Sequence, residues 1–309
     1  MPHDQHKLRY PFAMATQTHA KLPVLDFSIE ELKPGSSSWL SARNEVCRVL
    51  EDYGYFVAEL GNKVPLELHN TMFGGVRELF NFPTETKMKV TSDQIKPCHG
   101  YTPTAQYERM LIDNATSTEK IQKESANSYV RLIAELDQMV TRMIFENYGV
   151  EKYYGSHMEF ATRSLVLLKY AEPQKSGTSK GVGIHTDKNF ITILHQNHVK
   201  GLEIKTKDDD WIVFDPSPSS FIVLAGGALQ VWSNDRIESC VHRVTLTESE
   251  TRYSLGLFVF HDEILHVLEE LVDEKYPLKY KPFNNFEFVK AQVQYGARGD
   301  LTVKAFCGV

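Results

Sequence analysis

The chain has 309 residues, with 34 lysines and arginines against 40 aspartates and glutamates, and its formal net charge is −6. This balance disfavours a nucleic-acid-binding protein, because such proteins usually carry a basic excess on one face. The four cysteines are scattered and form no Cys-x-x-Cys motif, which indicates a reducing compartment and a cytoplasmic protein. A metal site would therefore use histidine, of which there are 12, and carboxylate.

The N-terminal residues show no targeting or membrane segment. No window of the chain approaches the ~18 consecutive apolar residues of a membrane span, and the N-terminus lacks the apolar region of a secretory signal. Residues 1–13 are polar, so we expect them to form a disordered extension, with Met14 as an alternative start.

Short strands and helices are predicted for residues 14–160. Apolar residues recur at helical spacing up to Tyr53, and Gly54 stands where the C-terminal cap of that helix is expected. A second helix follows Pro65 and is ended by Pro83. We also expect strands at 22–27 and 55–57, irregular structure at 91–118, and a longer helix that runs to about residue 149.

The pattern changes at about residue 163, where short apolar runs are separated by turn signals at roughly 8–12-residue intervals, as in a sandwich or small barrel. The acidic run 208–210 falls between two of these segments; a hairpin tip is the preferred interpretation and a calcium site the alternative. We expect an all-β core at 161–265 and a helical tail at 266–309. The predicted strands are 165–168, 191–194, 202–204, 211–214, 221–224 and 253–260.

The motif His185-Thr186-Asp187 is a candidate metal site. On an extended backbone, residues i and i+2 project to the same face, so His185 and Asp187 can bind one ion together. His242, 55 residues after Asp187, is the candidate third ligand, since several strands can return the chain to the first. Two imidazoles and one carboxylate leave three octahedral positions open, as in non-haem Fe(II) oxygenases.

A second pair of polar residues follows ten residues after His242. Arg252 and Ser254 share one face of a predicted strand. An arginine binds a carboxylate through two hydrogen bonds, and the serine can add a hydroxyl. We therefore expect a pocket for a dicarboxylate cosubstrate; the alternative is an arginine paired with a surface acid.

The order His-x-Asp, about fifty-five residues, His, ten residues, Arg-x-Ser resembles the plant iron- and 2-oxoglutarate-dependent dioxygenases. The resemblance extends over nearly the whole chain and is closest to the branch that contains the glucosinolate-modifying AOP enzymes and deoxypodophyllotoxin synthase. It implies a mixed α/β, β-rich fold: a double-stranded β-helix (jelly-roll, cupin-like) core with flanking N- and C-terminal helices. Further segments that match the family are 22–27, 54–56, 82–87, 229–234, 271–274 and 304–309.

The resemblance also assigns roles to residues. His185, Asp187 and His242 would bind Fe(II) and form the catalytic centre, and Arg252 and Ser254 would hold the distal carboxylate of 2-oxoglutarate. Tyr170 matches the tyrosine of the family's Asn-x-Tyr element and would contact the cosubstrate.

Three positions of the chain depart from the family pattern. Leu168 replaces the asparagine of the Asn-x-Tyr element, which makes the contact of Tyr170 with the cosubstrate less secure. Gly227 stands where the family usually has aspartate, and Asp235 where it usually has glycine; we interpret both as structural changes in a turn.

One segment is shorter than in the family. After residues 119–122, relatives continue through a Trp-Pro-containing stretch, whereas here residues 123–125 lead almost directly into the long helix. That stretch lies near the substrate mouth in the family, so its loss, in the protein or in its gene model, would affect substrate binding and leave the metal site intact.

Other candidate sites are weaker. His195 and His198 are separated by an odd number of positions in a predicted strand, so they face opposite sides and are read as sheet residues. His99 is interpreted as a loop residue. No Gly-x-Gly-x-x-Gly, Walker A or Gly-x-Ser-x-Gly motif occurs in a suitable context, which disfavours dinucleotide, nucleotide triphosphate and serine-hydrolase chemistry.

The predicted function is that of an Fe(II)- and 2-oxoglutarate-dependent oxygenase that uses dioxygen, with ascorbate as a reductant. It would hydroxylate, demethylate or ring-close a small plant specialised metabolite and release succinate and CO2. A small molecule is the only partner expected, with no nucleic acid and no membrane, and a monomer is compatible with the sequence. The alternatives are a non-catalytic or substrate-impaired remnant of the fold, and a zinc hydrolase that uses the same ligands.

Overall fold

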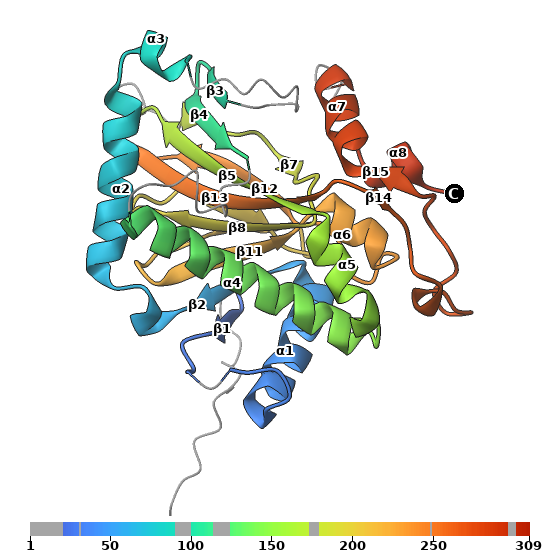
Figure 1. The fold of residues 1–309 in the computed structure, drawn as a ribbon. Helices are drawn as coiled ribbons and strands as arrows, with labels where there is room; N and C mark the ends of the chain where they lie inside the picture. Colours follow the sequence, from blue (N-terminus) through green and yellow to red (C-terminus); the bar gives the residue numbers. More distant parts are fainter. Residues whose placement is uncertain are drawn as a thin grey trace, which may run out of the picture.

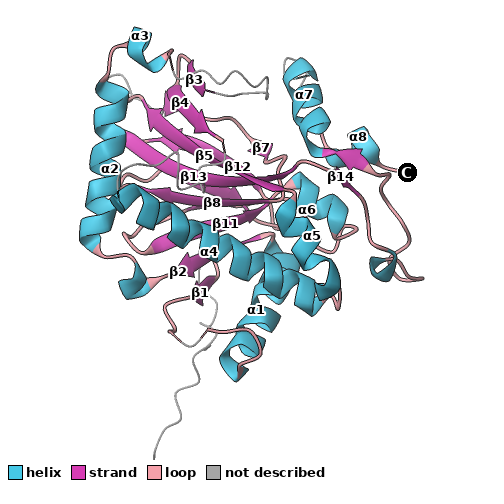
Figure 2. Cartoon of the chain, viewed as in Figure 1, coloured by secondary structure: helices cyan, strands magenta, loops and turns pink. Residues whose placement is uncertain are grey.

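An eight-stranded sheet separates a layer of helices from a second, smaller sheet (Figure 1 and Figure 2). The structure, a computed structural model, describes residues 21–30, 32–89, 100–113, 124–172, 179–247, 249–295 and 301–309.

The first five described strands belong to the large sheet, and after them the chain crosses back and forth between the two sheets. The strands are β1 Val24–Asp26, β2 Tyr55–Glu59, β3 Gly100–Pro103, β4 Tyr107–Ile112, β5 Ala161–Tyr170, β6 Ser179–Lys180, β7 His185–Thr186, β8 Ile191–Gln196, β9 Leu202–Lys205, β10 Trp211–Val213, β11 Ser220–Ala225, β12 Val241–Leu246, β13 Arg252–His261, β14 Ile264–Leu265 and β15 Phe283–Asn284. The large sheet has the order β1-β2-β11-β8-β13-β5-β4-β3. The small sheet has the order β10-β9-β12-β6, and β7 also pairs with β12. Two facing sheets of this kind form the predicted jelly-roll core.

Strand β11 shows why the core strands read as continuous apolar runs. Phe221 and Val223 pack in the cluster beneath the helices, whereas Ile222 and Leu224 pack in the cluster between the two sheets. Since successive side chains of a strand point to opposite faces, a strand covered on both faces needs apolar residues at every position. The inner face of the large sheet, which looks toward the small sheet, is therefore enclosed.

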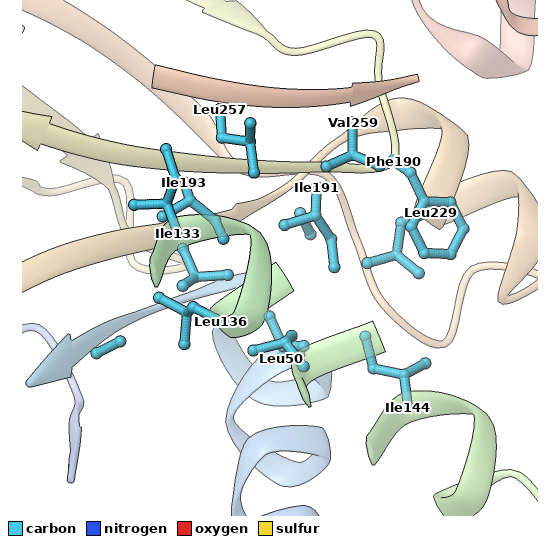
Figure 3. Packing of buried hydrophobic residues seen from close by; sticks show 14 of the residues in the cluster. Leu50, Ile133, Leu136, Ile144, Phe190, Ile191, Ile193, Leu229, Leu257 and Val259 are labelled. Carbon is cyan, nitrogen blue, oxygen red and sulfur yellow. The ribbon is translucent and has the colours of Figure 1, made fainter. Parts of the chain in front are cut away.

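The helices are α1 Ser37–Tyr53, α2 Leu66–Asn81, α3 Thr84–Lys87, α4 Glu124–Asn147, α5 Tyr154–Glu159, α6 Gly227–Trp232, α7 Asn285–Tyr295 and α8 Val303–Cys307, with 3-10 turns at Gly61–Lys63, Glu151–Tyr153 and Glu269–Leu271. Helices α1, α2 and α4 cover the outer face of the large sheet, whereas α7 and α8 lie to one side, next to α6 (Figure 1). Figure 3 shows Ile133 and Leu136 of α4 facing Ile191 and Ile193 of β8, with Leu50 of α1 beside them. None of the described helices is long and apolar enough to cross a membrane.

The predicted cap of α1 is confirmed. Gly54 has φ 78°, and its N–H donates to the carbonyl of Leu50 over 2.8 Å. A Cβ at this position would lie 2.5 Å from the carbonyl oxygen of Glu238, so both the backbone angle and the close approach require glycine. Helix α4 is described from Glu124 onward, which agrees with the expectation that residues 123–125 lead almost directly into the long helix.

The prediction of irregular structure at 91–118 is wrong for its middle part. Residues 100–112 form the hairpin of β3 and β4, and β4 pairs with β5 from Tyr107↔Tyr170 to Ile112↔Leu165. The sequence of β4 has no apolar alternation to reveal it; the exposed edge of the ten-residue strand β5 provides its hydrogen-bond partners. The short ladder between β14, at the end of the predicted core segment, and β15, in the predicted helical tail, was also not predicted.

Several expectations fall outside the described residues: the disorder of 1–13, the start at Met14, His99, and most of the shortened segment. The division at residues 160/161 and 265/266 stays a prediction. The acidic run 208–210 forms the tip of the β9–β10 hairpin, with Asp209 at φ 66° and paired with Lys205, as the preferred interpretation had it.

Candidate metal and cosubstrate site

The structure brings His185, Asp187 and His242 together. His185 ends its loop on the short strand β7 and lies opposite His242 of β12 in the antiparallel register. In the described part of the chain, these three form the one group whose ligand atoms could hold a metal ion, all within 4.8 Å of one another. Asp187 Oδ1 is 3.6 Å from His185 Nε2 and 3.8 Å from His242 Nε2. The predicted triad is thus a compact cluster of two imidazoles and one carboxylate.

Backbone carbonyls orient both imidazoles. Nδ1 of His185 lies 2.8 Å from the carbonyl of Gly183, and Nδ1 of His242 lies 3.2 Å from the carbonyl of Cys240. Because a carbonyl oxygen only accepts, each Nδ1 carries the proton and each Nε2 keeps a free lone pair. In each histidine, Nε2 is the ring nitrogen that lies near Asp187. The imidazoles therefore have the tautomer, protonated at Nδ1, that a metal site needs.

The two oxygens of Asp187 have different partners. Oδ2 accepts a hydrogen bond of 2.6 Å from the hydroxyl of Thr192, which itself accepts one of 3.0 Å from the Asn189 amide. Oδ1 faces the histidines. The backbone carbonyl of Asp187 accepts from the N–H of Gly227 over 2.7 Å, at the start of α6. The carboxylate is therefore held from the side chain and from the backbone.

The electrostatics of the cluster favour cation binding. Burial alone would raise the pKa of Asp187, but His242, His185 and the Thr192 hydrogen bond bring it well below its usual range. Burial lowers the pKa of His242 to about 4, so this imidazole is neutral at pH 7. Burial also disfavours the charged form of His185, but Asp187 outweighs it and the pKa of His185 is raised.

Arg252 presents a buried cation on the inner face of the large sheet. Its side chain is 1% exposed, its Nη2 donates to Gln196 Oε1 over 2.7 Å, and its guanidinium lies 4.8 Å from the centre of the Tyr170 ring. Its Nε and Nη1 are buried and have no hydrogen-bond partner among the residues that the structure describes. A buried cation with unsatisfied N–H groups is costly unless an anion meets it, so this residue fits the distal carboxylate of a dicarboxylate ligand.

Tyr170 and Ser254 adjoin Arg252 as expected. Arg252 pairs with Tyr170 across the β13–β5 ladder, and Ser254 pairs with Leu168. Burial raises the pKa of Tyr170, while Arg252 and Ser254 beside it oppose that rise, and the phenol stays protonated. Leu168, which replaces the family's asparagine, packs in the apolar cluster between the sheets.

One strand connects the two halves of the site. Thr192 and Gln196 both lie on the inner face of β8, and they contact Asp187 and Arg252 respectively. Their β13 partners are Phe258 and Ser254. Sequence reasoning missed both residues. The available signal was two polar residues of the same parity in a strand whose other residues, apart from His195, are apolar.

The interpretation of His195 and His198 as sheet residues holds for His195, which lies in β8, and is wrong for His198, which follows the end of that strand. His195 is buried under the helices, where its Nδ1 is 2.9 Å from the Tyr129 hydroxyl and its Nε2 is 3.2 Å from His69 Nδ1. His198 is exposed and pairs with Glu250. Neither belongs to the metal cluster.

The turn substitutions are connected to the C-terminal tail. A Cβ at Gly227 would lie 2.8 Å from Val303 Cγ1, so a larger residue would displace α8. Asp235, at φ 65°, accepts hydrogen bonds from Tyr280 and Gln230 and lies 3.3 Å from the amine of Lys304. These contacts support the interpretation of both departures as structural.

Comparison with known proteins identifies the family. Residues 149–261 match the model of the 2OG-Fe(II) oxygenase superfamily, and residues 22–129 match that of the N-terminal region of the non-haem dioxygenases in morphine synthesis. The probable 2-oxoglutarate-dependent dioxygenase AOP1.2 of Arabidopsis thaliana is 40% identical over 309 aligned residues, which cover 93% of this chain and 95% of that protein.

Two solved structures share the fold. Dioxygenase for auxin oxidation 1 from Arabidopsis thaliana, in complex with 2-oxoglutarate, has a TM-score of 0.73 at 24% identity and covers 83% of this chain and 100% of its own. JOX2 in complex with 2OG, Fe and JA has a TM-score of 0.72 at 22% identity, covering 87% of this chain and 84% of its own. The predicted jelly roll, and iron(II) with 2-oxoglutarate as its cofactor and cosubstrate, are confirmed. The chain belongs to the iron(II)- and 2-oxoglutarate-dependent oxygenases.

Proposed function

We propose that this oxygenase hydroxylates, demethylates or ring-closes a small plant specialised metabolite. In a hydroxylation, one atom of dioxygen enters the substrate and the other enters succinate, while 2-oxoglutarate loses CO2. Bound iron(II) supplies the activation of dioxygen. The protein's own residues contribute the geometry and the exclusion of water.

We assign His185, Asp187 and His242 to the metal. This assignment rests on the two Nε2 atoms and the one carboxylate oxygen that converge within 4.8 Å. The Thr192 hydrogen bond and the two carbonyl contacts hold these groups before any ion binds. Three ligands on one face leave room for a bidentate cosubstrate and for dioxygen.

We assign Arg252, Ser254 and Tyr170 to 2-oxoglutarate. The single observation that carries this assignment is the enclosed guanidinium of Arg252, two of whose nitrogens have no hydrogen-bond partner in the described part of the chain. The Tyr170 ring below it and the Ser254 side chain beside it would complete a site for the distal carboxylate.

The zinc-hydrolase alternative uses the same triad but predicts no role for Arg252. A succinate-release assay with Fe(II), 2-oxoglutarate, ascorbate and a panel of plant metabolites separates the two. We expect substrate-coupled succinate from the wild type and none from Asp187→Ala. Turnover that survives Asp187→Ala would refute the metal assignment, and activity with zinc that is indifferent to Arg252→Ala would favour the hydrolase.

The remnant alternative predicts 2-oxoglutarate binding without substrate-coupled turnover. The intact liganding positions favour the active enzyme.

We also propose a cytoplasmic location, which is supported by the free, buried thiols of Cys47, Cys240 and Cys307. Fluorescence microscopy of a tagged chain tests that proposal.

A further inference from the structure

Gln196, at the end of β8, is buried and makes two directional hydrogen bonds. Its side chain is 2% exposed. Nε2 donates to the carbonyl of Val199 over 2.7 Å, and Oε1 accepts from Nη2 of Arg252 over 2.7 Å. Because the amide nitrogen only donates and the carbonyl of Val199 only accepts, the amide has one orientation. The oxygen must therefore face Arg252.

The guanidinium of Arg252 is confined on several sides. Gln196 binds one nitrogen, and the Tyr170 ring lies 4.8 Å from Cζ. The backbone of Gly201 comes so close that a Cβ there would lie 3.1 Å from Arg252 Cδ. Rotation of the side chain is thus restricted, while Nε and Nη1 have no hydrogen-bond acceptor within the described ranges of the chain.

The partner of Arg252 differs from those of two other arginines in the described strands. Arg163 donates to Asp137 over 2.8 Å, and Arg243 donates to Glu203 over 2.6 Å. Arg252 is more buried than either, yet in the residues that the structure describes it forms no ion pair and has an uncharged amide as acceptor. A carboxylate at position 196 would neutralise the guanidinium and compete with an anionic ligand; an amide orients it and leaves its charge in place.

We propose that Gln196 is a positioning residue for the cosubstrate: it orients Arg252 toward the distal carboxylate and keeps the charge of the guanidinium available. This proposal rests on the proposed function. Under this proposal, strand β8 supports both halves of the site. Thr192 holds the metal ligand Asp187, and Gln196, four residues and about 13 Å along the same strand, holds the cosubstrate ligand.

The test compares two ligands of the Mn(II)-loaded protein by calorimetry. N-oxalylglycine has a distal carboxylate, whereas oxalate offers only the metal-chelating end. We expect Gln196→Glu to weaken N-oxalylglycine binding by at least about tenfold, and Gln196→Met, which removes the hydrogen bond without adding charge, by about three- to tenfold. Oxalate binding should be unchanged in both. Gln138→Glu, at an exposed position of α4, adds the same charge and should change neither affinity.

The binding affinities of Gln196→Glu decide the proposal. Wild-type affinity of Gln196→Glu for N-oxalylglycine, or an equal loss of oxalate binding, would overturn the proposal. If the wild-type protein binds Mn(II) but neither ligand, the proposed function itself fails. Where Gln196→Glu does not fold, Gln196→Met provides the same comparison. In the succinate assay, the KM for 2-oxoglutarate should rise while kcat at saturation stays near the wild-type value.

Discussion

The hydroxyl of Thr192 donates a 2.6 Å hydrogen bond to Oδ2 of Asp187, and the other carboxylate oxygen, Oδ1, faces the two imidazoles. Thr192 is fully buried at the centre of β8, on the inner face of the large sheet. A rigid strand, rather than the loop that carries Asp187, thereby determines which carboxylate oxygen is available to a cation.

Replacing Thr192 by valine should weaken metal binding. The isosteric change removes the hydrogen bond that orients Asp187 and leaves its Oδ2 buried without that donor, and loss of such supporting contacts typically reduces metal affinity about 10- to 100-fold. Titration of the metal-free protein with Mn(II) measures the effect. Thr192→Ser keeps a hydroxyl and should restore most of the affinity; equal losses in both variants would show that packing, not the hydrogen bond, is responsible.

Breaking the buried pair of Asp137 and Arg163 should destabilise the fold. Asp137 is fully buried in α4, and its Oδ2 lies 2.8 Å from Arg163 Nε on β5. Asp137→Ala would leave a nearly buried guanidinium unpaired, at a cost of about 3–5 kcal/mol in the free energy of unfolding, measured in urea. The control is Glu45→Ala, which breaks the exposed pair with Arg48 and should cost less than about 1 kcal/mol. Similar losses in both would contradict the prediction.

Gly54 and Gly149 form a matched pair for a test of backbone strain against steric clash. Both have positive φ, 78° and 68°, but a Cβ at Gly54 would lie 2.5 Å from the carbonyl oxygen of Glu238, whereas one at Gly149 meets nothing within 4 Å. Gly149→Ala should cost about 1–2 kcal/mol for the left-handed conformation alone. Gly54→Ala should cost clearly more. Thermal unfolding of both variants distinguishes the contributions, and equal shifts in Tm would show that the clash relaxes.

The metal-free protein should lose stability as the pH falls below about 6.5. Burial lowers the pKa of His157 to about 3, and the nearby His261 and Arg163 add to this shift. Between the unfolded value of 6.5 and this folded value, the unfolded chain binds a proton that the native state does not. Within this pH range, the titration of His157 therefore lowers the free energy of unfolding by up to about 1.4 kcal/mol for each unit by which the pH falls.

His157→Phe isolates that contribution. The ring sits between Phe145 and Phe190, at centroid distances of 5.0 and 4.5 Å, so a phenyl group suits the surroundings. Urea unfolding of the metal-free protein at pH 7.5 and pH 5 should show a smaller difference for the variant than for the wild type. An unchanged difference would mean that His157 does not titrate as its burial indicates.

Much of the site was predictable because it depends on local backbone geometry. The pleat of an extended chain places His185 and Asp187 on one side, and likewise Arg252 and Ser254. The cap at Gly54 follows from the same kind of local rule. The hairpin of β3 and β4 was not predictable in this way, since the pairing edge that stabilises it belongs to β5, about fifty residues later.

The sequence by itself determined which chemical groups this protein can use: two imidazoles and a carboxylate in a recognisable order, and an arginine with a serine. It also determined that the core is built from short strands. Only the tertiary structure decided how those groups are held. That Asp187 is fixed by Thr192, and that Arg252 meets the amide of Gln196 while Arg163 meets a carboxylate, depends on which strands become neighbours. The periodicity of a strand assigns a side chain to one face of the sheet. Which residue it contacts there depends on how the two sheets pack together.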